Sequence, residues 1–582
     1  MPASPDGRGP GAPHRLLGWL DAPRAGRGVR LAQDDGTWTR TSYAELAGRV
    51  RQVATALRDH GVRDGDTVAV IMPTSVELIA AIFGAWQARA VLTVVAPRSF
   101  ESERECLARV TPVMAAAGPA LVLCGPGERP LTEKAAPGVT VLEAGLRRDA
   151  DHHGAGHHGA GHHGAGHHGA GSAAREPSGL ALLQFTSGST STPRGVRVTW
   201  GNLADNLERI GAAIGWRDGD AGASWLPIHH DMGFIGGLLF PVAAQSDLWL
   251  LRPDQFITDP ARWLECFDSG RATHGAAPSF ALGYAARKVK PERLAGLDLS
   301  GWRSVIVGAE RVDAAALARF AALTSPAGFS GRAFQPAYGL AENTLLVCAS
   351  PLGEPVRLAR PDWSRTAFGQ PVPVTETTEF APVGPDAGRL AGQGWLAGQG
   401  RLAGQGWLAG HGWADGVRIL DDDGAPLPDG WLGEIAVSGA SVTAGYHGLS
   451  SVTHRSGELR TADAGFVLGG QLYVLGRMGD SIKVSGRSVF MEDLDARVAT
   501  ASGLSPGRLC VVGATRGPRP GLAVFAEADP GPWQDAVLRF LRAELGTSLD
   551  IQIITGKRGL LKRTTSGKPR RRHMWQALNE MR

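Results

Sequence analysis

One loop of the sequence gathers the residue types that hold a polyanion. An apolar run over residues 181–185 predicts a buried strand, and a loop of small residues follows it. Hydroxyl groups and backbone N–H groups of the loop can donate hydrogen bonds, Gly188 and Gly195 let the backbone approach closely, and Arg194 adds positive charge. An ordinary surface turn rich in Ser and Thr is the alternative. The spacing Gly-x-x-x-x-Gly-Lys-Ser/Thr of a Walker A loop is absent.

Two further stretches carry residues that could do chemistry. The run Tyr338-Gly339-Leu340-Ala341-Glu342 offers an aromatic face for a base, a glycine turn and a carboxylate able to hold Mg²⁺ against phosphates. A core tyrosine beside a surface glutamate is the structural alternative for that run alone. The second stretch, residues 225–237, contains His229, His230 and Asp231 ahead of several glycines. Those three side chains are equally compatible with a metal site or with ordinary structural histidines.

The motifs resemble those of adenylate-forming enzymes. The Thr-Ser-Gly-Ser-Thr loop, with Gln184-Phe185 before it and Thr192-Pro193 after it, fits best the fatty acyl-AMP ligase branch of that superfamily. Residues 225–237 are very close to the W-L-P-x-x-H-D-M-G-L-I-G-G segment of the same branch. Six such motifs stand in the family's order between Gln184 and Lys568. The resemblance therefore covers essentially the whole chain outside two repetitive insertions.

The resemblance implies a role for each matching residue. It places His230 near the acyl carboxylate, Asp463 on both ribose hydroxyls, Asp480 at a hinge between two domains, and Lys568 at the catalytic lysine position. Ala462 replaces the glycine usual in the ribose motif, a small change that we expect the fold to tolerate. The residues implied to bind ATP are Thr186, Ser187, Gly188, Ser189, Thr190, Gly308, Ala309, Glu310, Tyr338, Gly339, Asp463 and Arg477, with Glu342 and Thr186 toward Mg²⁺.

Length and composition indicate a folded protein of more than one domain. The chain has 582 residues, 43% of them hydrophobic and 20% charged, with a net charge of +4. Five widely spaced cysteines without metal-ligand spacing predict reduced thiols and a cytoplasmic protein. We expect neither a signal peptide nor a membrane span, because Gln87 and Arg89 interrupt the most apolar stretch, residues 78–97.

Apolar runs alternating with amphipathic stretches predict an α/β fold. A disordered N-terminus is expected over residues 1–28, an N-terminal adenylation domain with parallel sheets over 29–479, and a smaller, mobile α+β lid domain over 480–582. Four His-His-Gly-Ala-Gly copies at 152–171 predict a solvent loop, since histidine pairs on a glycine chain have no fixed metal geometry. The tryptophan-containing repeat at 389–414 predicts a second insertion, of uncertain structure.

The implied reaction is R–COO⁻ + ATP → R–CO–AMP + pyrophosphate, with Mg²⁺ as cofactor and a fatty acid as substrate. A separate acyl carrier protein is the expected acceptor, with an acyl-CoA ligase as the nearest alternative. Residues 351–388 occupy the place of a family insertion that restrains domain rotation in the branch that spares CoA. A non-catalytic interaction protein is a third reading, and intact Glu342, Asp463 and Lys568 argue against it. The basic segment 557–572 lacks the aromatic residues expected of a nucleic-acid-binding tail.

Overall fold

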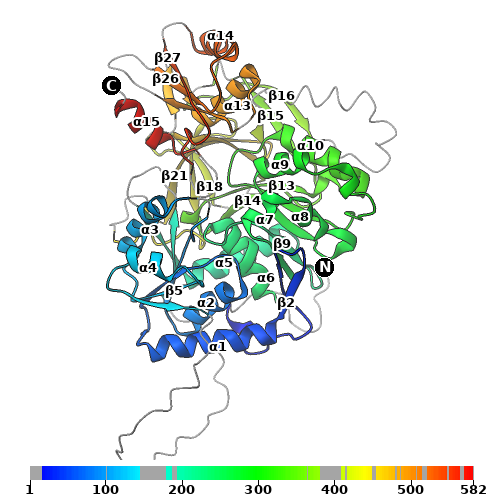
Figure 1. The fold of residues 1–582 in the computed structure, drawn as a ribbon. Helices are drawn as coiled ribbons and strands as arrows, with labels where there is room; N and C mark the ends of the chain where they lie inside the picture. The colour runs from blue at the N-terminus through cyan, green and yellow to red at the C-terminus, as the bar shows by residue number, and fades with distance from the viewer. Residues whose placement is uncertain are drawn as a thin grey trace, which may run out of the picture.

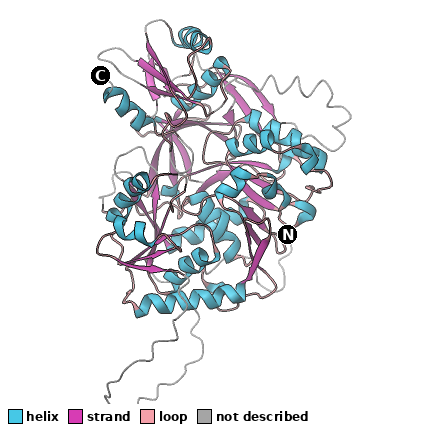
Figure 2. Ribbon diagram, viewed as in Figure 1, coloured by secondary structure: helices cyan, strands magenta, loops and turns pink. Residues whose placement is uncertain are grey.

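The computed structural model describes most of the chain between residues 16 and 580. The residues in this interval that it leaves out are 100, 145–178, 187–192, 363–364, 367, 381–407, 413–415, 422, 449–453, 456, 479–480, 485–486, 506, 514–520, 547–548 and 564–568. The predicted insertion at 152–171 lies outside the described residues, as do Trp395, Trp407 and Trp413 of the second repeat. The rest forms two large sheets covered by helices, a third sheet beside them, and a smaller C-terminal unit (Figures 1 and 2).

The first large sheet has six strands, parallel except for the antiparallel pair β7 and β8. The strand predicted over residues 181–185 is present and extends one residue further at each end. In spatial order the strands are β6 (Thr140–Glu143), β5 (Leu121–Cys124), β3 (Thr67–Ile71), β4 (Val91–Val95), β7 (Leu180–Thr186) and β8 (Arg194–Thr199). The helices of this half are α1 (Tyr43–Asp59), α2 (Val76–Gln87), α3 (Glu103–Ala117) and α4 (Arg129–Ala135).

Capping residues explain where two of these helices begin. The sequence predicts a capping box wherever Ser or Thr stands three residues before Glu, as at Ser42 and Glu45 and at Thr74 and Glu77. The first box is present at the start of α1, where Ser42 accepts from the backbone N–H of Glu45 and Glu45 accepts from that of Ser42. The second prediction, between Thr74 and Glu77, is wrong. Ser75 caps α2 instead, by accepting from the N–H of Leu78, while Glu77 forms an ion pair with Arg49.

The second large sheet has eight strands and is parallel between its two antiparallel edge strands, β14 and β2. The order is β14 (Leu346–Ala349), β13 (Phe334–Gly339), β12 (Ser304–Val307), β11 (His274–Ala277), β9 (Gly222–Ser224), β10 (Leu248–Leu250), β1 (Gly28–Ala32) and β2 (Trp38–Ser42). The helices of this half are α5 (Trp200–Ala213), α6 (Phe240–Ala243), α7 (Pro253–Thr258), α8 (Ala261–Glu265), α9 (Ser279–Lys288) and α10 (Ala314–Thr324). Together the two sheets confirm the predicted α/β class.

A third sheet, of five antiparallel strands, follows in the chain, and a small three-stranded sheet packs against it. One strand of the small sheet, β17, comes from the tryptophan repeat: Leu408 and Ala409 pair with Ala359 and Leu358 and are buried. The end of that insertion is therefore part of the fold. The five strands are β18 (Val417–Leu420), β19 (Gly433–Ser438), β20 (His454–Arg455), β21 (Glu458–Leu468) and β22 (Gln471–Arg477), and the three are β16 (Val374–Glu379), β15 (Arg357–Pro361) and β17 (Leu408–Ala409).

The C-terminal unit has an apolar core of its own, built from residues after position 480, such as Leu494, Val511, Val524 and Leu541. Figure 1 shows its orange and red elements gathered at the opposite end of the molecule from α1. These elements are β23 (Ser481–Val484), β24 (Arg487–Phe490), α13 (Met491–Ser502), β25 (Leu509–Gly513), β26 (Gly521–Ala526), α14 (Trp533–Leu545), β27 (Asp550–Thr555) and α15 (Arg571–Glu580).

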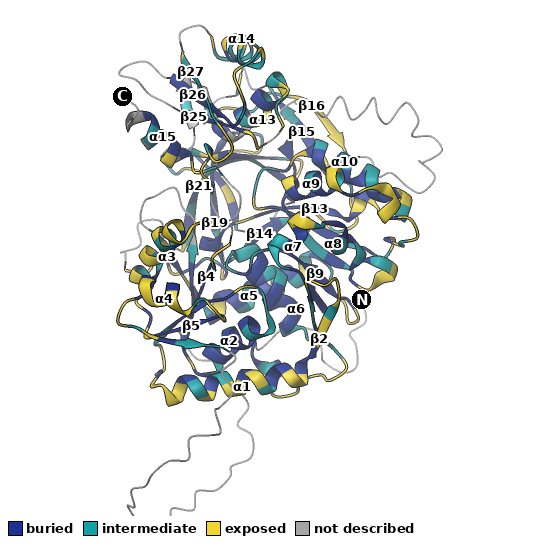
Figure 3. Ribbon diagram, viewed as in Figure 1, coloured by how far each residue is buried: buried dark blue, intermediate teal, exposed yellow. Residues whose placement is uncertain are grey.

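Part of the segment 1–28, which was expected to be disordered, has a defined structure, because the chain is described from Leu16 onward. Trp19 is 2% exposed and its ring meets the rings of Tyr43 and Phe83 edge to face, at centroid distances of 5.6 and 5.2 Å. An indole of that size stabilises the fold through its buried area, so the chain from Leu16 onward is fixed despite its many glycines and prolines. Figure 3 shows the outward face of α1, by contrast, as exposed.

None of the described helices is long and apolar enough to cross a membrane. The stretch 78–97, which has the highest apolar content, divides into α2, of 12 residues, and the buried strand β4.

Deleting residues 152–171 should leave the fold and the activity nearly unchanged. The segment falls between β6, which ends at Glu143, and β7, which begins at Leu180, and closing a loop of different length changes its entropy only slowly. We expect the melting temperature and the specific activity of the deletion variant to match those of the intact protein. A large loss of either quantity would show that the histidines stabilise the structure. A comparable loss after wild type is treated with a Zn²⁺ and Ni²⁺ chelator would show the same.

Candidate active site

The topology brings the sequence motifs to one edge of the two large sheets. In the eight-stranded sheet β9, β11, β12 and β13 are parallel, so their carboxyl ends lie along the same edge. The motifs at 225–237 and 308–310 follow β9 and β12 directly, and the motif at 338–342 begins in the last two residues of β13. The phosphate loop follows β7 of the other sheet. The side-chain amide of Gln184 joins the two edges by donating to the carbonyl oxygen of His229, at 3.0 Å.

The loop predicted to grip phosphates is bounded by a strand pair. Thr186 ends β7 and pairs with Arg194, which begins β8, so the two arms of the loop are fixed side by side. Gly195 is needed here, because a Cβ at that position would stand 3.0 Å from the ring of Phe185. Ser187, Gly188, Ser189 and Thr190 lie outside the described residues, as does the side chain of Thr186.

The histidine segment leads into an unusual helix. Residues Met232–Leu239 form a π-helix, a rare geometry that is frequent at functional sites, and Asp231 caps it by accepting from the N–H of Met232. The rings of His229 and His230 lie 4.5 Å apart. Burial, followed by the neighbouring His230, lowers the pKa of His229 well below its ordinary value, so His229 is neutral at pH 7. The glycines of this segment serve packing: a Cβ at Gly233 would stand 2.3 Å from the carbonyl oxygen of Pro227.

The Gly308-Ala309-Glu310 segment turns sharply away from β12. A Cβ at Gly308 would stand 2.9 Å from the carbonyl oxygen of Ala337, so glycine allows β12 and β13 to stay close just before Tyr338. Ala309 has φ +66°, in the left-handed region that alanine rarely adopts. The carboxylate of Glu310 accepts from the backbone N–H of Phe280 at 2.8 Å and so fixes the start of α9 beside this turn.

Tyr338, Asp463 and Arg477, which are far apart in the sequence, are in contact. The hydroxyl of Tyr338 donates to Oδ2 of Asp463 at 2.6 Å, and Nε of Arg477 lies 3.5 Å from Oδ1 of the same carboxylate. Burial and the charge of Asp463 raise the pKa of Tyr338, so the phenol keeps its proton and remains a donor. Burial alone would lower the pKa of Arg477, but the carboxylates of Asp463 and Glu342 outweigh it and raise that pKa.

A buried glutamate, which the sequence motifs do not indicate, holds the strand that carries Asp463. Glu434 on β19 is 6% exposed, and it accepts from Nε of Arg460 at 2.6 Å and from the N–H of Ala462 at 2.9 Å. The hydroxyl of Thr461 donates to the carbonyl oxygen of Ile435 at 2.7 Å. These bonds fix β21 up to the bend at Ala462, directly before Asp463.

Replacing Ala462 by glycine should stabilise the protein. Ala462 has φ +59°, which costs an L-residue with a Cβ roughly 1–2 kcal/mol, and glycine avoids that cost while losing part of the gain through its freer unfolded chain. We expect a melting temperature about 1–2 °C higher, measured by differential scanning fluorimetry. The matched variant is Ala464→Gly, two residues along β21, where the buried side chain has no positive φ to relieve. It should melt lower than wild type. Equal shifts in both variants would contradict the strain assigned to Ala462.

Glu342 lies on a tight turn next to this cluster. Gly339 makes the turn possible, because a Cβ there would stand 2.1 Å from the carbonyl oxygen of Leu345. Glu342 is 8% exposed, and its Oε1 accepts from the hydroxyl of Tyr446 at 2.7 Å. Sequence reasoning missed Tyr446. Its only signal was a tyrosine in a glycine-bounded segment shortly after a strand, and its partner stands 104 positions earlier.

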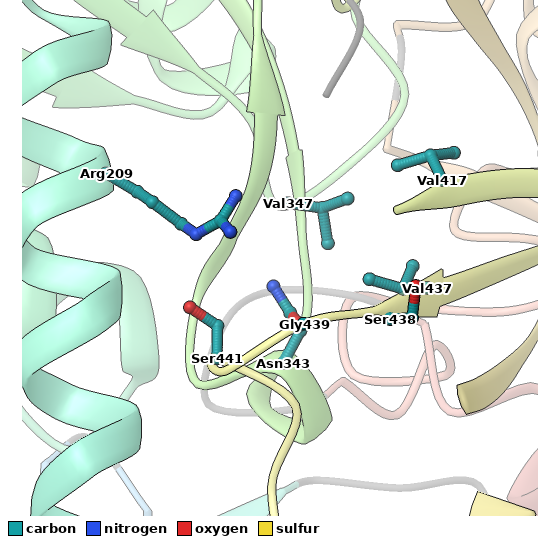
Figure 4. Close-up of a pocket in the computed structure, with 8 residues that line it drawn as sticks. All are labelled: Arg209, Asn343, Val347, Val417, Val437, Ser438, Gly439 and Ser441. Atoms are coloured by element: carbon teal, nitrogen blue, oxygen red, sulfur yellow. The ribbon is translucent and has the colours of Figure 1, made fainter. Parts of the chain in front are cut away.

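Asn206 on α5 also holds this turn, through hydrogen bonds. The sequence motifs did not indicate it either. Its fully buried amide donates to the carbonyl oxygens of Asn343 and Leu346, at 3.2 and 3.0 Å, and to the hydroxyl of Ser441, at 2.9 Å. Figure 4 shows Asn343 and Ser441 beside a small cavity into which Arg209 reaches from α5. The hydroxyls and the amide that line it are already bonded within the protein, so we assign it no ligand.

The structure thus brings four of the predicted site residues into one cluster with Tyr446: Tyr338, Glu342, Asp463 and Arg477. Gly308, Ala309, Glu310 and His230 stand at neighbouring strand ends along the same sheet edge. Asp480 and Lys568 lie outside the described residues, as do Ser187, Gly188, Ser189 and Thr190 of the loop. Nowhere in the described part of the chain do three or more His, Cys, Asp or Glu side chains gather as metal ligands. Glu342 is instead a single carboxylate with one oxygen already bonded. That suits Mg²⁺, which uses one or two protein carboxylates together with phosphates and water.

Comparison with known proteins agrees with these motifs. The family model described as AMP-binding enzyme matches residues 22–379. A putative fatty-acid–CoA ligase of Mycobacterium tuberculosis is 30% identical over 579 residues, which cover 92% of this chain and 91% of that protein. A long-chain-fatty-acid–AMP ligase of Mycolicibacterium smegmatis is 30% identical over 498 residues, with 80% and 73% covered.

Solved structures give the same result. A structure from a study of fatty acyl-adenylate ligases of E. coli and L. pneumophila superimposes with a TM-score of 0.81 at 27% identity, covering 98% of each chain. The match confirms the predicted fold of a large domain with parallel sheets and a smaller C-terminal sheet domain. It also confirms the resemblance to fatty acyl-AMP ligases, and the chain belongs to the family of AMP-binding enzymes.

Proposed function

We propose that this enzyme activates a fatty acid, or a related medium- or long-chain carboxylic acid, to its acyl-AMP. The acyl group then passes to the phosphopantetheine thiol of a separate acyl carrier protein. The observation that carries the proposal is the cluster of Tyr338, Asp463, Arg477 and Glu342, which combines a phenol, two carboxylates and a guanidinium at the edge where the phosphate loop begins. Relatives named as fatty-acid–AMP ligases over most of this chain support the acyl substrate.

The chemistry needs charge neutralisation more than proton transfer. The attacking carboxylate is already ionised at pH 7, so no base is required. It must approach the α-phosphate of a tetra-anion, and positive groups and N–H donors aimed at that phosphate lower the barrier. Arg477 supplies a guanidinium beside Asp463, and Arg194 a second one at the foot of the loop. Mg²⁺ held by Glu342, and by Thr186 of the loop, would neutralise part of the phosphate charge.

Each remaining site residue has a place in this proposal. Asp463 would accept the ribose hydroxyls, since a carboxylate has room for several hydrogen bonds and Tyr338 takes only one of them. His230 would lie at the acyl carboxylate, at the start of the π-helix that follows β9. Gly308, Ala309 and Glu310 would form one wall for the adenine. Lys568, from the C-terminal domain, would place its ammonium against the charge that develops at the reacting phosphate.

The domain division belongs to the same proposal. Residues 480–582 would form a lid that turns about Asp480 after pyrophosphate leaves, so that the thiol can enter. The separate apolar core of the residues after 480 supports a unit able to move as one body. We place the enzyme in the cytoplasm, since its five cysteines are buried thiols, as expected of a protein kept under reducing conditions.

Pyrophosphate release with a panel of carboxylic acids tests the proposal. Acetate, octanoate, laurate, palmitate, benzoate and several amino acids should be offered with Mg·ATP, and acyl-AMP identified by mass spectrometry. We expect release with the C8–C16 acids and little with acetate or amino acids. Failure of every fatty acid to release pyrophosphate would overturn the proposal.

A further inference from the structure

The segment around Tyr446 pairs with β8, the strand that follows the phosphate loop. The backbone N–H of His447 donates to the carbonyl oxygen of Gly195, and that of Arg197 donates to the carbonyl oxygen of Gly445, each at 2.8 Å. Val196 and Tyr446 are bridge partners between these two bonds. The backbone of Tyr446 is therefore fixed to β8, only a few residues beyond the loop.

The side chain of Tyr446 connects that strand to Glu342. Its hydroxyl donates to Oε1 of Glu342 at 2.7 Å, while the guanidinium of Arg194 lies 5.5 Å from the centre of its ring. Burial, and next the charge of Glu342, raise the pKa of Tyr446, so the phenol stays protonated. The second carboxylate oxygen, Oε2, has no hydrogen-bond partner among the described residues.

The same segment also holds the backbone of Glu342. The N–H of Thr443 donates to the carbonyl oxygen of Glu342 at 3.0 Å. Two residues after Glu342, Thr344 has φ +65°, a conformation that a β-branched residue adopts only when its surroundings impose it. The hydroxyl of Thr344 donates to the carbonyl oxygen of Ser441 at 2.8 Å. Residues 441–446 therefore fix both the strained turn and the carboxylate that it carries.

We propose that Tyr446 is a positioning residue for metal binding. Its hydroxyl fixes the rotamer of Glu342 by taking one carboxylate oxygen, and so presents the other oxygen to a divalent cation on the ATP phosphates. Because the backbone of Tyr446 is paired with β8, the cation site and the first residues of that strand keep one relative position. This inference rests on the proposed function, since it takes the nucleotide and its cation to bind at Glu342.

Tyr446→Phe separates this role from packing, because it keeps the ring over which Arg194 lies and removes only the hydroxyl. The affinity of the full-length protein for Mn²⁺ should be measured by electron paramagnetic resonance in the presence of a non-hydrolysable ATP analogue. A hydrogen bond to a charged group of this kind corresponds to a loss of about 10- to 150-fold in Mn²⁺ affinity. In steady-state assays the Mg²⁺ concentration for half-maximal rate should rise by a similar factor, with kcat at saturating Mg²⁺ nearly unchanged.

Tyr43→Phe is the matched control. It also removes a buried tyrosine hydroxyl, which donates to the carbonyl oxygen of Ser246 at 2.7 Å between α1 and the second large sheet. It should lower the melting temperature without changing Mn²⁺ affinity. An equal loss of Mn²⁺ affinity in Tyr43→Phe would show that the loss in Tyr446→Phe reflects lower stability of the whole protein. That result would overturn the inference.

A double-mutant cycle with Glu342→Gln gives a second, independent test. Glutamine keeps the shape of the side chain but is a poor cation ligand, so Tyr446→Phe should have no further effect on Mn²⁺ affinity in that background. An additive loss, or an unchanged Mn²⁺ affinity in Tyr446→Phe alone, would overturn the inference. Wild type that binds Mn²⁺ and the analogue yet releases no pyrophosphate with any fatty acid would instead overturn the proposed function.

Discussion

Replacing Lys568 by alanine should lower the rate of acyl-AMP formation by about 10²–10³-fold, because one preorganised donor is lost from the charge that develops at the α-phosphate. ATP binding should be largely retained, since the other residues proposed to contact the phosphates belong to the N-terminal domain. The structure describes both ends of the loop that carries Lys568. Arg563 and Pro569 are bridge partners, and the N–H of Arg570 donates to the carbonyl oxygen of Lys562 at 2.8 Å. The chain on either side of residues 564–568 is thus closed and anchored.

Lys562→Ala is the matched control for this prediction. It removes one exposed charge from the same basic segment, six residues earlier, and should leave the rate within about twofold if general electrostatic attraction is not the cause. ATP binding is measured by calorimetry and adenylation by ATP–pyrophosphate exchange. Normal exchange in Lys568→Ala, or an equal loss in both variants, would contradict the assignment of Lys568.

Transfer of the acyl group to a holo carrier protein should outpace transfer to free CoA by orders of magnitude. A carrier protein docks and delivers its pantetheine arm at high effective concentration, whereas CoA must also place its own nucleotide. Free CoA is the alternative acceptor to test, because one relative that matches nearly the whole chain is named a putative fatty-acid–CoA ligase. Residues 351–388 decide between the two acceptors if they restrain the C-terminal domain.

The structure gives a physical basis for such a restraint. Within this segment, Val372 pairs through its N–H with the carbonyl oxygen of Gly430, and Gly369 does the same with Leu432. Phe368 and Val372 pack against a core that contains Phe466 and Tyr473 of the hairpin β21–β22. That hairpin carries Asp463 and Arg477 and ends three residues before Asp480. The segment is therefore bound to the strands that lead directly into the proposed hinge.

Thioester formation from a C8–C16 acid and ATP should be compared with holo carrier protein and with CoA as acceptors. In the double variant Phe368→Ala, Val372→Ala the packing on the hairpin is weakened, and the CoA rate should rise relative to the carrier rate. Leu107→Ala, Val113→Ala on α3 is the control, since it removes two partly buried side chains from a core of the first sheet. Efficient acyl-CoA production by the intact protein would move it to the CoA ligases.

The parallel sheets were predictable because their strands are buried on both faces. The runs at 67–71, 91–95 and 121–124 are almost entirely apolar, and such short runs between amphipathic helices have few other interpretations. The cap of α2 was misplaced because Thr74 and Ser75 are adjacent and both are good N-caps. Only the hydrogen bond to Leu78 identifies Ser75. Strand β17 was missed because its sequence repeats earlier units, and only its pairing with β15 distinguishes it.

The site residues that belong to sequence motifs were predictable. Those that act only through tertiary contacts were not. Tyr338, Asp463 and Arg477 follow from their motifs, but their mutual contact depends on bringing β13 beside the hairpin β21–β22. Asn206, Glu434 and Tyr446 have no local signal that sets them apart from other polar residues. Each acts on a turn or strand distant in sequence, as Asn206 does on the turn of Asn343, 137 positions away. The left-handed backbone at Ala309 and Ala462 could not be predicted either, since a positive φ is expected of glycine and not of alanine.

The fate of the carboxylate oxygens tests the central claim most directly. A fatty acid labelled with ¹⁸O in both carboxylate positions is incubated with the enzyme, Mg·ATP and holo carrier protein, and the products are analysed by mass spectrometry. If the carboxylate attacks the α-phosphate, thiol attack on the acyl carbon leaves one ¹⁸O in AMP and none in pyrophosphate. AMP without label, or label in pyrophosphate or inorganic phosphate, would contradict the formation of an acyl-AMP.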